Sequence, residues 1–121
     1  MQYEFKIIAF TNETQFSIDL ATECNKYGFS LDFLEKAGDI ESQIADDIVA
    51  AAIIDLNDDR FDPFNLGQSI KNLHGLPVFG VLNKFSRKIQ EKAKKNGYDL
   101  IFTKKMLIRS IRDVIIHVSN E

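Results

Sequence analysis

The fold of this chain is decided by a short stretch that reads Val49-Ala-Ala-Ala-Ile-Ile-Asp55 and continues as Leu-Asn-Asp-Asp-Arg-Phe-Asp-Pro63. Its first six residues are all apolar, and the apolar run ends abruptly on a carboxylate. A short run that is apolar on both faces is typical of a strand buried in the middle of a parallel sheet. Open α/β sheets place their sites beyond the carboxyl ends of such strands. We therefore expect Asp55 to lie in the functional site.

Strand and helix patterns alternate along the chain on both sides of this stretch. Strand-like segments lie at residues 5–10, 29–33, 49–54, 78–82 and 99–103, and helical apolar spacing follows each of them, the last over residues 108–119. Five successive β-α units require a parallel sheet with helices on both faces. The predicted fold is a single α/β domain over residues 1–121, with three α-β-α layers and the flavodoxin-like strand order 2-1-3-4-5.

Local signals predict where two of the helices begin and which side they bury. Asn12 lies three residues before Gln15, which is the spacing of a capping box at the start of the first helix. The second helix is expected to start at residues 38–39. Its isoleucines, Ile40, Ile44 and Ile48, recur at helical spacing and are predicted to face inward.

Length and composition restrict the class of protein. A chain of 121 residues with 45% hydrophobic and 27% charged residues is ordinary for one packed domain. Cys24 is the only cysteine, which fits a reducing cytoplasm, and it falls on the apolar stripe of the first helix. One cysteine and two histidines cannot form a tetrahedral metal site. With no apolar run of membrane-spanning length and no signal-peptide pattern, we expect a cytoplasmic protein.

Charge is distributed very unevenly. Between Lys84 and Arg112 lie ten basic residues and two acidic ones, a net charge of +8, whereas the rest of the chain carries −11. Such a field accelerates and orients encounter with an oppositely charged partner.

Several short motifs, taken in order, resemble the receiver domains of bacterial response regulators (the CheY-like domains). They are Asp55-Leu56-Asn57 with Leu66 and Ile70 after it, Leu76-Pro77-Val78 before the fourth strand, and Phe102-Thr103-Lys104 at the end of the fifth. The resemblance covers nearly the whole chain and implies the same fold. It also implies a chemistry, the transfer of a phosphoryl group onto Asp55 with the help of Mg²⁺.

The resemblance assigns site positions residue by residue. Asp55 takes the phosphoacceptor position and Asn57 the position whose backbone carbonyl binds metal. The receiver lysine is Lys104, or Lys105 if the register shifts by one, and the aromatic switch position is then Ile101 or Phe102.

Other receiver positions carry unexpected residues. The position of the family's acidic pair falls on Thr11 and Asn12. Glu13 is acidic but comes one residue after this pair, and its side chain is expected to face away from the site. The switch hydroxyl falls on Leu82, with Asn83 next to it. The family's Lys-Pro bond is Lys104-Lys105, which is expected to be trans because a non-proline cis bond costs about 2.5–4 kcal/mol.

These departures suggest a degenerate receiver. Mg²⁺ usually binds one or two carboxylates, and only Asp55, with the Asn57 carbonyl, remains as a weak candidate site. We therefore expect no cofactor and no enzyme activity, but a stand-alone signalling domain that acts by binding a protein. The alternative is a functional receiver that is phosphorylated on Asp55 with Mg²⁺ bound.

The basic segment predicts where a partner would bind. In the receiver fold, the fourth helix, fifth strand and fifth helix lie side by side, so their basic residues are expected to share one face that docks an acidic protein. The residues of this expected face are Arg87, Lys88, Lys92, Lys95, Lys105 and Arg109. Nucleic acid is a less favoured ligand, because no aromatic residue is interleaved with the helix lysines to stack bases.

Two further constellations have simpler interpretations. Asp58, Asp59 and Asp62 could bind a cation, but charged loop residues are usually solvated. Thr11 and Thr14 could hold a phosphate at a helix N-terminus, but helix capping explains them better.

Overall fold

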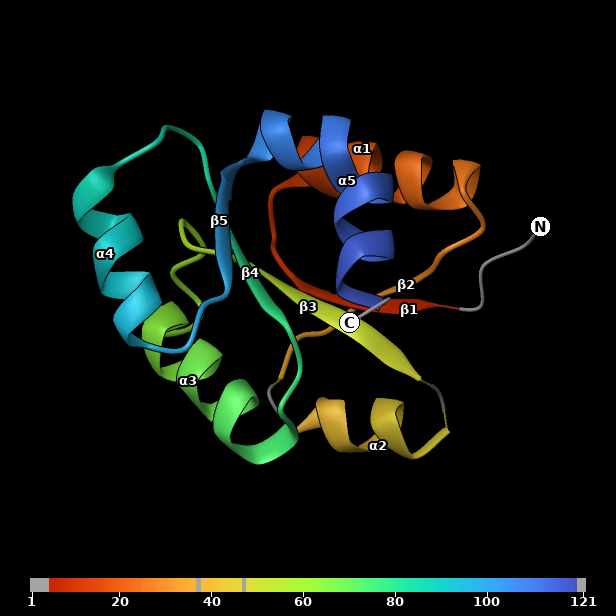
Figure 1. Cartoon of the computed structure of the whole chain (residues 1–121), viewed down its shortest axis with the longest axis horizontal. Helices are drawn as coiled ribbons and strands as arrows, with labels where there is room; N and C mark the ends of the chain where they lie inside the picture. The colour runs from red at the N-terminus through yellow and green to blue at the C-terminus, as the bar shows by residue number, and fades with distance from the viewer. Residues whose placement is uncertain (1–4, 37, 47, 120–121) are drawn as a thin grey trace.

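The computed structural model describes residues 5–36, 38–46 and 48–119 and contains one five-stranded parallel sheet in the order β2-β1-β3-β4-β5, as predicted (Figure 1). Strands and helices alternate along the chain: β1 Lys6–Phe10, α1 Thr14–Lys26, β2 Ser30–Phe33, α2 Asp39–Asp46, β3 Val49–Asp55, α3 Pro63–His74, β4 Val78–Leu82, α4 Arg87–Lys95, β5 Leu100–Thr103 and α5 Lys104–Ser119. None of the helices in the described residues is long and apolar enough to cross a membrane.

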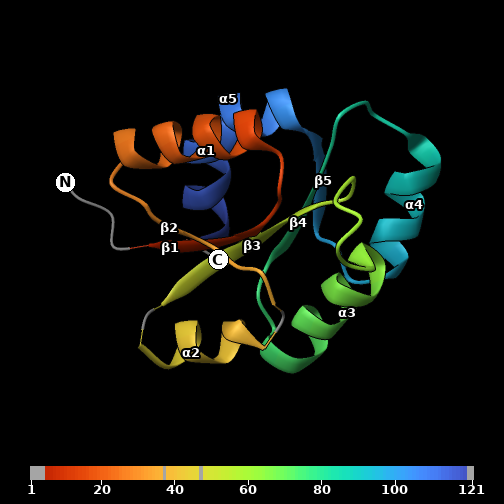
Figure 2. The same ribbon diagram turned by 180° about the vertical axis from the view of Figure 1, so that it is seen from behind.

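Helices cover both faces of the sheet. α1 and α5 lie on one face, and α2, α3 and α4 lie on the other (Figures 1 and 2). Each face has its own cluster of buried apolar residues, and Cys24 lies in the cluster under α1 and α5. Strand β3 is the central strand and contributes to both clusters, so an unbroken apolar run was required there.

The register of the strands brings four chain segments to one edge of the sheet. Phe10 of β1 pairs with Ile54, and Asp55 pairs with Val81 of β4. Leu82 pairs with Thr103 of β5. Since the strands are parallel, the residues that follow β1, β3, β4 and β5 all emerge at the same carboxyl edge.

Two helix starts differ from the sequence-based expectation. The N-cap of α1 is Glu13, whose carboxylate accepts the backbone N–H of Phe16, and not Asn12. α5 begins at Lys104 instead of residue 108, because the Thr103 hydroxyl accepts the N–H of Met106 and so caps the helix directly after β5. Apolar periodicity could not reveal this polar first turn.

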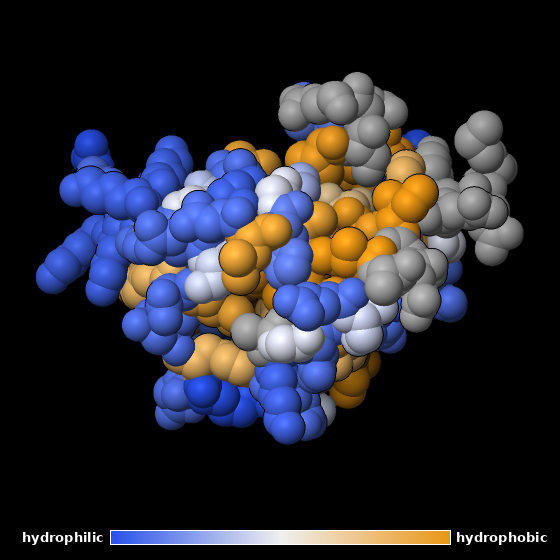
Figure 3. Space-filling view, turned by 90° about the horizontal axis from the view of Figure 1, so that it is seen from below, coloured by the Kyte–Doolittle hydropathy of each residue, from blue (hydrophilic) through white to orange (hydrophobic). Residues whose placement is uncertain are grey.

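Apolar residues are exposed at the opposite, amino-terminal edge of the sheet. Ile48 is 78% exposed, although helical spacing predicted it on a buried side, and Leu73 of α3 is 74% exposed. Ile48 directly precedes β3, and Leu73 lies near the end of α3, shortly before β4 begins. Figure 3 shows apolar side chains gathered on this side of the molecule.

Tyr98 joins α3 to the segment before β5. Its ring lies against Gly67, and its hydroxyl donates a hydrogen bond of 2.6 Å to the carbonyl of Pro63. Burial raises the pKa of this phenol well above its usual value, so the hydroxyl remains a donor.

The Tyr98–Gly67 contact generates a stability prediction. A Cβ added at Gly67 would lie 2.3 Å from a Tyr98 ring carbon, so Gly67→Ala should lower the free energy of unfolding by about 1–3 kcal/mol. Urea unfolding measures the loss. Gly38→Ala is the matched control, since a Cβ there meets no atom within 4 Å. Equal stability of the two variants would contradict the close packing.

Candidate functional site

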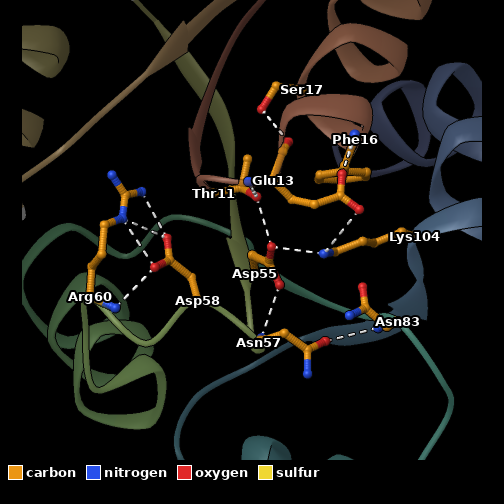
Figure 4. A network of polar contacts seen from close by, with 10 residues as sticks. All are labelled: Thr11, Glu13, Phe16, Ser17, Asp55, Asn57, Asp58, Arg60, Asn83 and Lys104. Carbon is orange, nitrogen blue, oxygen red and sulfur yellow. Dashed lines mark hydrogen bonds and ion pairs between the residues drawn. The ribbon is translucent and has the colours of Figure 1, made fainter.

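The Asp55 carboxylate is the centre of a polar network at the carboxyl edge of the sheet (Figure 4). The side chain is 2% exposed, and both of its oxygens are engaged. Oδ2 accepts a hydrogen bond of 2.7 Å from the Thr11 hydroxyl and lies 2.9 Å from the Lys104 ammonium. Oδ1 accepts the backbone N–H of Asn57 at 2.9 Å. Asp55 and Lys104, the residues at the acceptor and lysine positions, therefore form a buried ion pair.

Lys104, and not Lys105, is the lysine that meets Asp55. Lys104 is buried at the first position of α5, whereas Lys105 is exposed. The described residues contain no cis peptide bond, in agreement with the expectation for the Lys104–Lys105 bond. With this register the aromatic switch position falls on Ile101, and the neighbouring Phe102 packs edge-on against Phe79 in the core.

The segment after β1 contributes a hydroxyl and a carboxylate. Thr11 is buried and donates to Asp55, while Asn12 is exposed. The expectation that Glu13 faces away is wrong, because its Oε1 lies 3.8 Å from the Lys104 ammonium. The same carboxylate caps α1, and this second role holds it at the end of the helix, beside Lys104.

Two loops at this edge are joined through an asparagine. The Asn57 side-chain oxygen accepts the backbone N–H of Asn83 at 2.9 Å, which ties the loop after β3 to the loop after β4. Leu82, at the position of the switch hydroxyl, is 1% exposed and offers no polar group. The hydroxyl that reaches Asp55 therefore comes from Thr11, at the end of β1.

A second ion pair lies beside the first and was not predicted. The Asp58 side chain is 1% exposed, and its two oxygens accept hydrogen bonds of 2.8–3.1 Å from the Arg60 side chain. Burial opposes ionisation of Asp58, but the hydrogen bonds from Arg60 outweigh it and hold the pKa of the carboxyl below its usual value. Asp58 is not a solvated loop residue. The i, i+2 spacing of Asp58 and Arg60 was the available signal.

The oxygens at this edge do not fit a Mg²⁺ ion. Asp55 is committed to Lys104 and Thr11, Asp58 to Arg60, and Glu13 to the N-terminus of α1. Within the described residues, no three His, Cys, Asp or Glu side chains are close enough to hold a metal. A hard dication needs carboxylate oxygens that are free of competing ammonium and guanidinium groups.

The basic residues of α4 and α5 contact different neighbouring elements. The Lys92 ammonium lies 4.3 Å from the centre of the Phe64 ring of α3, so this side chain is on the α3 side of α4. Lys88 and Lys95 are four and three residues away and fall on the same ridge. Hydrophilic side chains project at this end of the molecule (Figure 3).

The remaining members of the expected face lie elsewhere. Lys105 and Arg109 line a cleft between α5 and α1, and Arg87 pairs with Glu91 on the exposed side of α4. Lys92 therefore contacts α3 and the α5 pair borders α1, while the single face over α4, β5 and α5 stays a prediction.

Solved structures share the fold. A two-component response regulator from Clostridium difficile aligns at a TM-score of 0.79 and 15% identity over 97% of this chain and 99% of its own. A CheY-like response regulator receiver domain protein from Methanospirillum hungatei aligns at 0.76 and 14% over 98% of each chain. An orphan response regulator of H. pylori aligns at 0.74 and 14%, covering 95% of this chain and 99% of that one. The chain therefore has the receiver-domain fold.

No protein-family model matches the sequence, and no curated protein matches it.

The buried pair generates the first prediction about the site. Lys104→Met should lower the free energy of unfolding by roughly 3 kcal/mol, because it leaves the Asp55 carboxylate without its counter-charge. Lys105→Met removes an exposed charge on the same helix and should change stability by less than about 0.5 kcal/mol. Urea unfolding compares them. A loss of equal size in both variants would contradict the pairing.

The second prediction about the site concerns acid stability. The folded state lowers the pKa of Asp58, so its ionised form stabilises the fold above the unfolded pKa of about 3.9 and loses this effect as pH falls through the folded pKa. In Asp58→Asn, the free energy of unfolding should therefore fall less steeply below about pH 4. Asp59→Asn, which changes the exposed neighbour, is the control and should follow the unmodified protein. If the free energy of unfolding fell equally steeply below pH 4 in all three proteins, the role of Arg60 would be contradicted.

Proposed function

We propose that this domain is a receiver-like signalling module that works by binding a partner protein, and not by Mg²⁺-dependent phosphorylation of Asp55. The observation that carries the proposal is the closed state of the Asp55 carboxylate, whose oxygens are taken by Lys104, Thr11 and the Asn57 N–H. On this proposal the domain is not an enzyme, and its place is the cytoplasm.

Charge balance supports the absence of phosphoryl transfer. The two buried acids, Asp55 and Asp58, are matched by Lys104 and Arg60, so neither buried carboxylate is left without a counter-charge to attract a dication. Phosphoryl transfer depends on such a metal to neutralise charge in the transition state. The neutral Thr11 and Asn12 supply no carboxylate for a metal, and the apolar Leu82 supplies no hydroxyl on β4.

The alternative is a receiver that is phosphorylated on Asp55. The retained contact between Asp55 and a lysine at the start of α5 favours it. It would require the Asp55–Lys104 pair to open and a metal to bind beside Arg60.

The partner that we propose is acidic and approaches the lysine ridge of α4, which consists of Lys88, Lys92 and Lys95. These side chains are exposed, and α4 carries one acidic residue, Glu91, which pairs with Arg87. Association would be steered by this field and weakened as salt screens it.

Phosphorylation of Asp55 is tested directly. After incubation with Mg²⁺ and acetyl phosphate or phosphoramidate, intact-mass measurement should detect no phosphorylated protein, while a conventional receiver in the same reaction gains one phosphoryl group. A gain of one phosphoryl that disappears in Asp55→Asn would establish the alternative function.

The partner surface is tested by paired charge reversals. Lys88→Glu with Lys95→Glu should reduce capture of the partner at low salt by at least about tenfold, while circular dichroism and urea unfolding remain unchanged. Lys92 is left in place because its ammonium contacts Phe64. The control is Lys26→Glu with Lys36→Glu, which changes net charge equally at exposed sites outside α4. Equal loss in both double variants would indicate a net-charge effect and refute a local surface.

A further inference from the structure

A cleft of about 560 Å³ separates the first turns of α1 from those of α5. Its lining combines apolar and charged side chains, namely Glu13, Gln15, Phe16, Asp19, Asn83, Lys104, Lys105, Ile108 and Arg109. The volume is within the range of about 300–1,000 Å³ in which small-molecule sites are found, and an apolar floor with a few polar groups is their usual composition. Asp55 does not line it, but three of its lining residues, Glu13, Asn83 and Lys104, also belong to the polar network around Asp55 that Figure 4 shows.

The negative side chains of the cleft are already engaged. The Glu13 carboxylate caps α1 and lies 3.8 Å from Lys104. On the next turn, Asp19 accepts a hydrogen bond of 2.9 Å from the Gln15 amide. A cationic ligand would have to displace these contacts.

The positive side chains include two that have no counter-ion. Among the residues that the structure describes, Lys105 and Arg109 make no ion pair or hydrogen bond through their side chains. Both come from the first turns of α5, where helical spacing places them one above the other. The Asn83 amide at the end of the cleft adds a neutral donor. Lys105 and Arg109 are therefore the cations of the cleft that are available to meet an anionic ligand.

We propose that this cleft binds a small organic acid with an apolar body. The carboxylate contacts Arg109 and Lys105, and the apolar body lies over Phe16 and Ile108. A planar carboxylate accepts two parallel hydrogen bonds from a guanidinium, which makes Arg109 the principal contact. Lys104 also lines the cleft, so a bound ligand lies next to the lysine that pairs with Asp55. Binding in the cleft is thereby coupled to the Asp55–Lys104 pair without phosphorylation. The proposal does not depend on the partner surface of α4.

The test uses three probes that share one phenylpropyl frame: 3-phenylpropionate, 3-phenylpropylamine and 3-phenylpropanol. They are titrated into the ¹⁵N-labelled protein, and amide chemical shifts report the binding position. We expect saturable shifts at Asn83, Lys105 and Arg109 with the acid. The alcohol should bind about tenfold more weakly because it keeps only the apolar contacts, and the amine more weakly still.

Variants on one helix provide the control. Arg109→Gln should weaken binding of the acid by about fivefold or more. Arg112→Gln should leave it unchanged, because Arg112 is outside the cleft and contacts Asp113 and Tyr27. Absence of saturable shifts, equal binding of acid and amine, or an unchanged affinity in Arg109→Gln would overturn the proposal. Tighter binding of a blocked Phe-Glu dipeptide than of the free acid would assign the cleft to a partner's side chains and would also overturn it.

Discussion

A carboxylate at the end of a strand that is buried on both faces must meet a positive charge, because an unpaired buried ion is strongly unfavourable. In this protein Lys104 meets Asp55 at 2.9 Å. Asp55 ends the central strand, whereas Lys104 opens α5 beyond the edge strand β5, so the contact spans half of the sheet. The early start of α5, the inward turn of Glu13 and the position of Thr11 are all arranged around this pair.

The same constraint explains why the site is electrostatically closed. Asp58 would be a second buried negative charge beside Asp55, and Arg60 neutralises it within the loop. The guanidinium also lies against the Phe61 ring, with 5.2 Å between Arg60 Cζ and the ring centre. An edge built from two internal ion pairs is stable without a bound ion, whereas a site with excess carboxylates would depend on one.

Because the charged groups around Asp55 are paired with one another, the charged groups that remain available to a ligand lie on the surface of the molecule. The α4 lysines and the α5 pair belong to one basic stretch of sequence but lie on different sides of the domain, the first towards α3 and the second towards α1. Two separate basic surfaces can serve two ligands. The lysine ridge is open and suits long-range attraction, while the α1–α5 cleft has walls and an apolar floor that suit a specific small molecule.

The sequence by itself determined the strand order and the buried central strand, because apolar runs and β-α alternation depend only on local residue order. The resemblance to receiver domains implied that a lysine after β5 belongs to the Asp55 site. It could not decide between Lys104 and Lys105, since that depends on the Thr103 cap that starts α5. Only the tertiary structure revealed the buried Asp58–Arg60 pair, the inward Glu13 and the division of the basic residues. The direction of a side chain depends on which elements pack beside it. A charged residue is predicted to be exposed from sequence alone, and only the structure shows that it is buried with a partner of opposite charge.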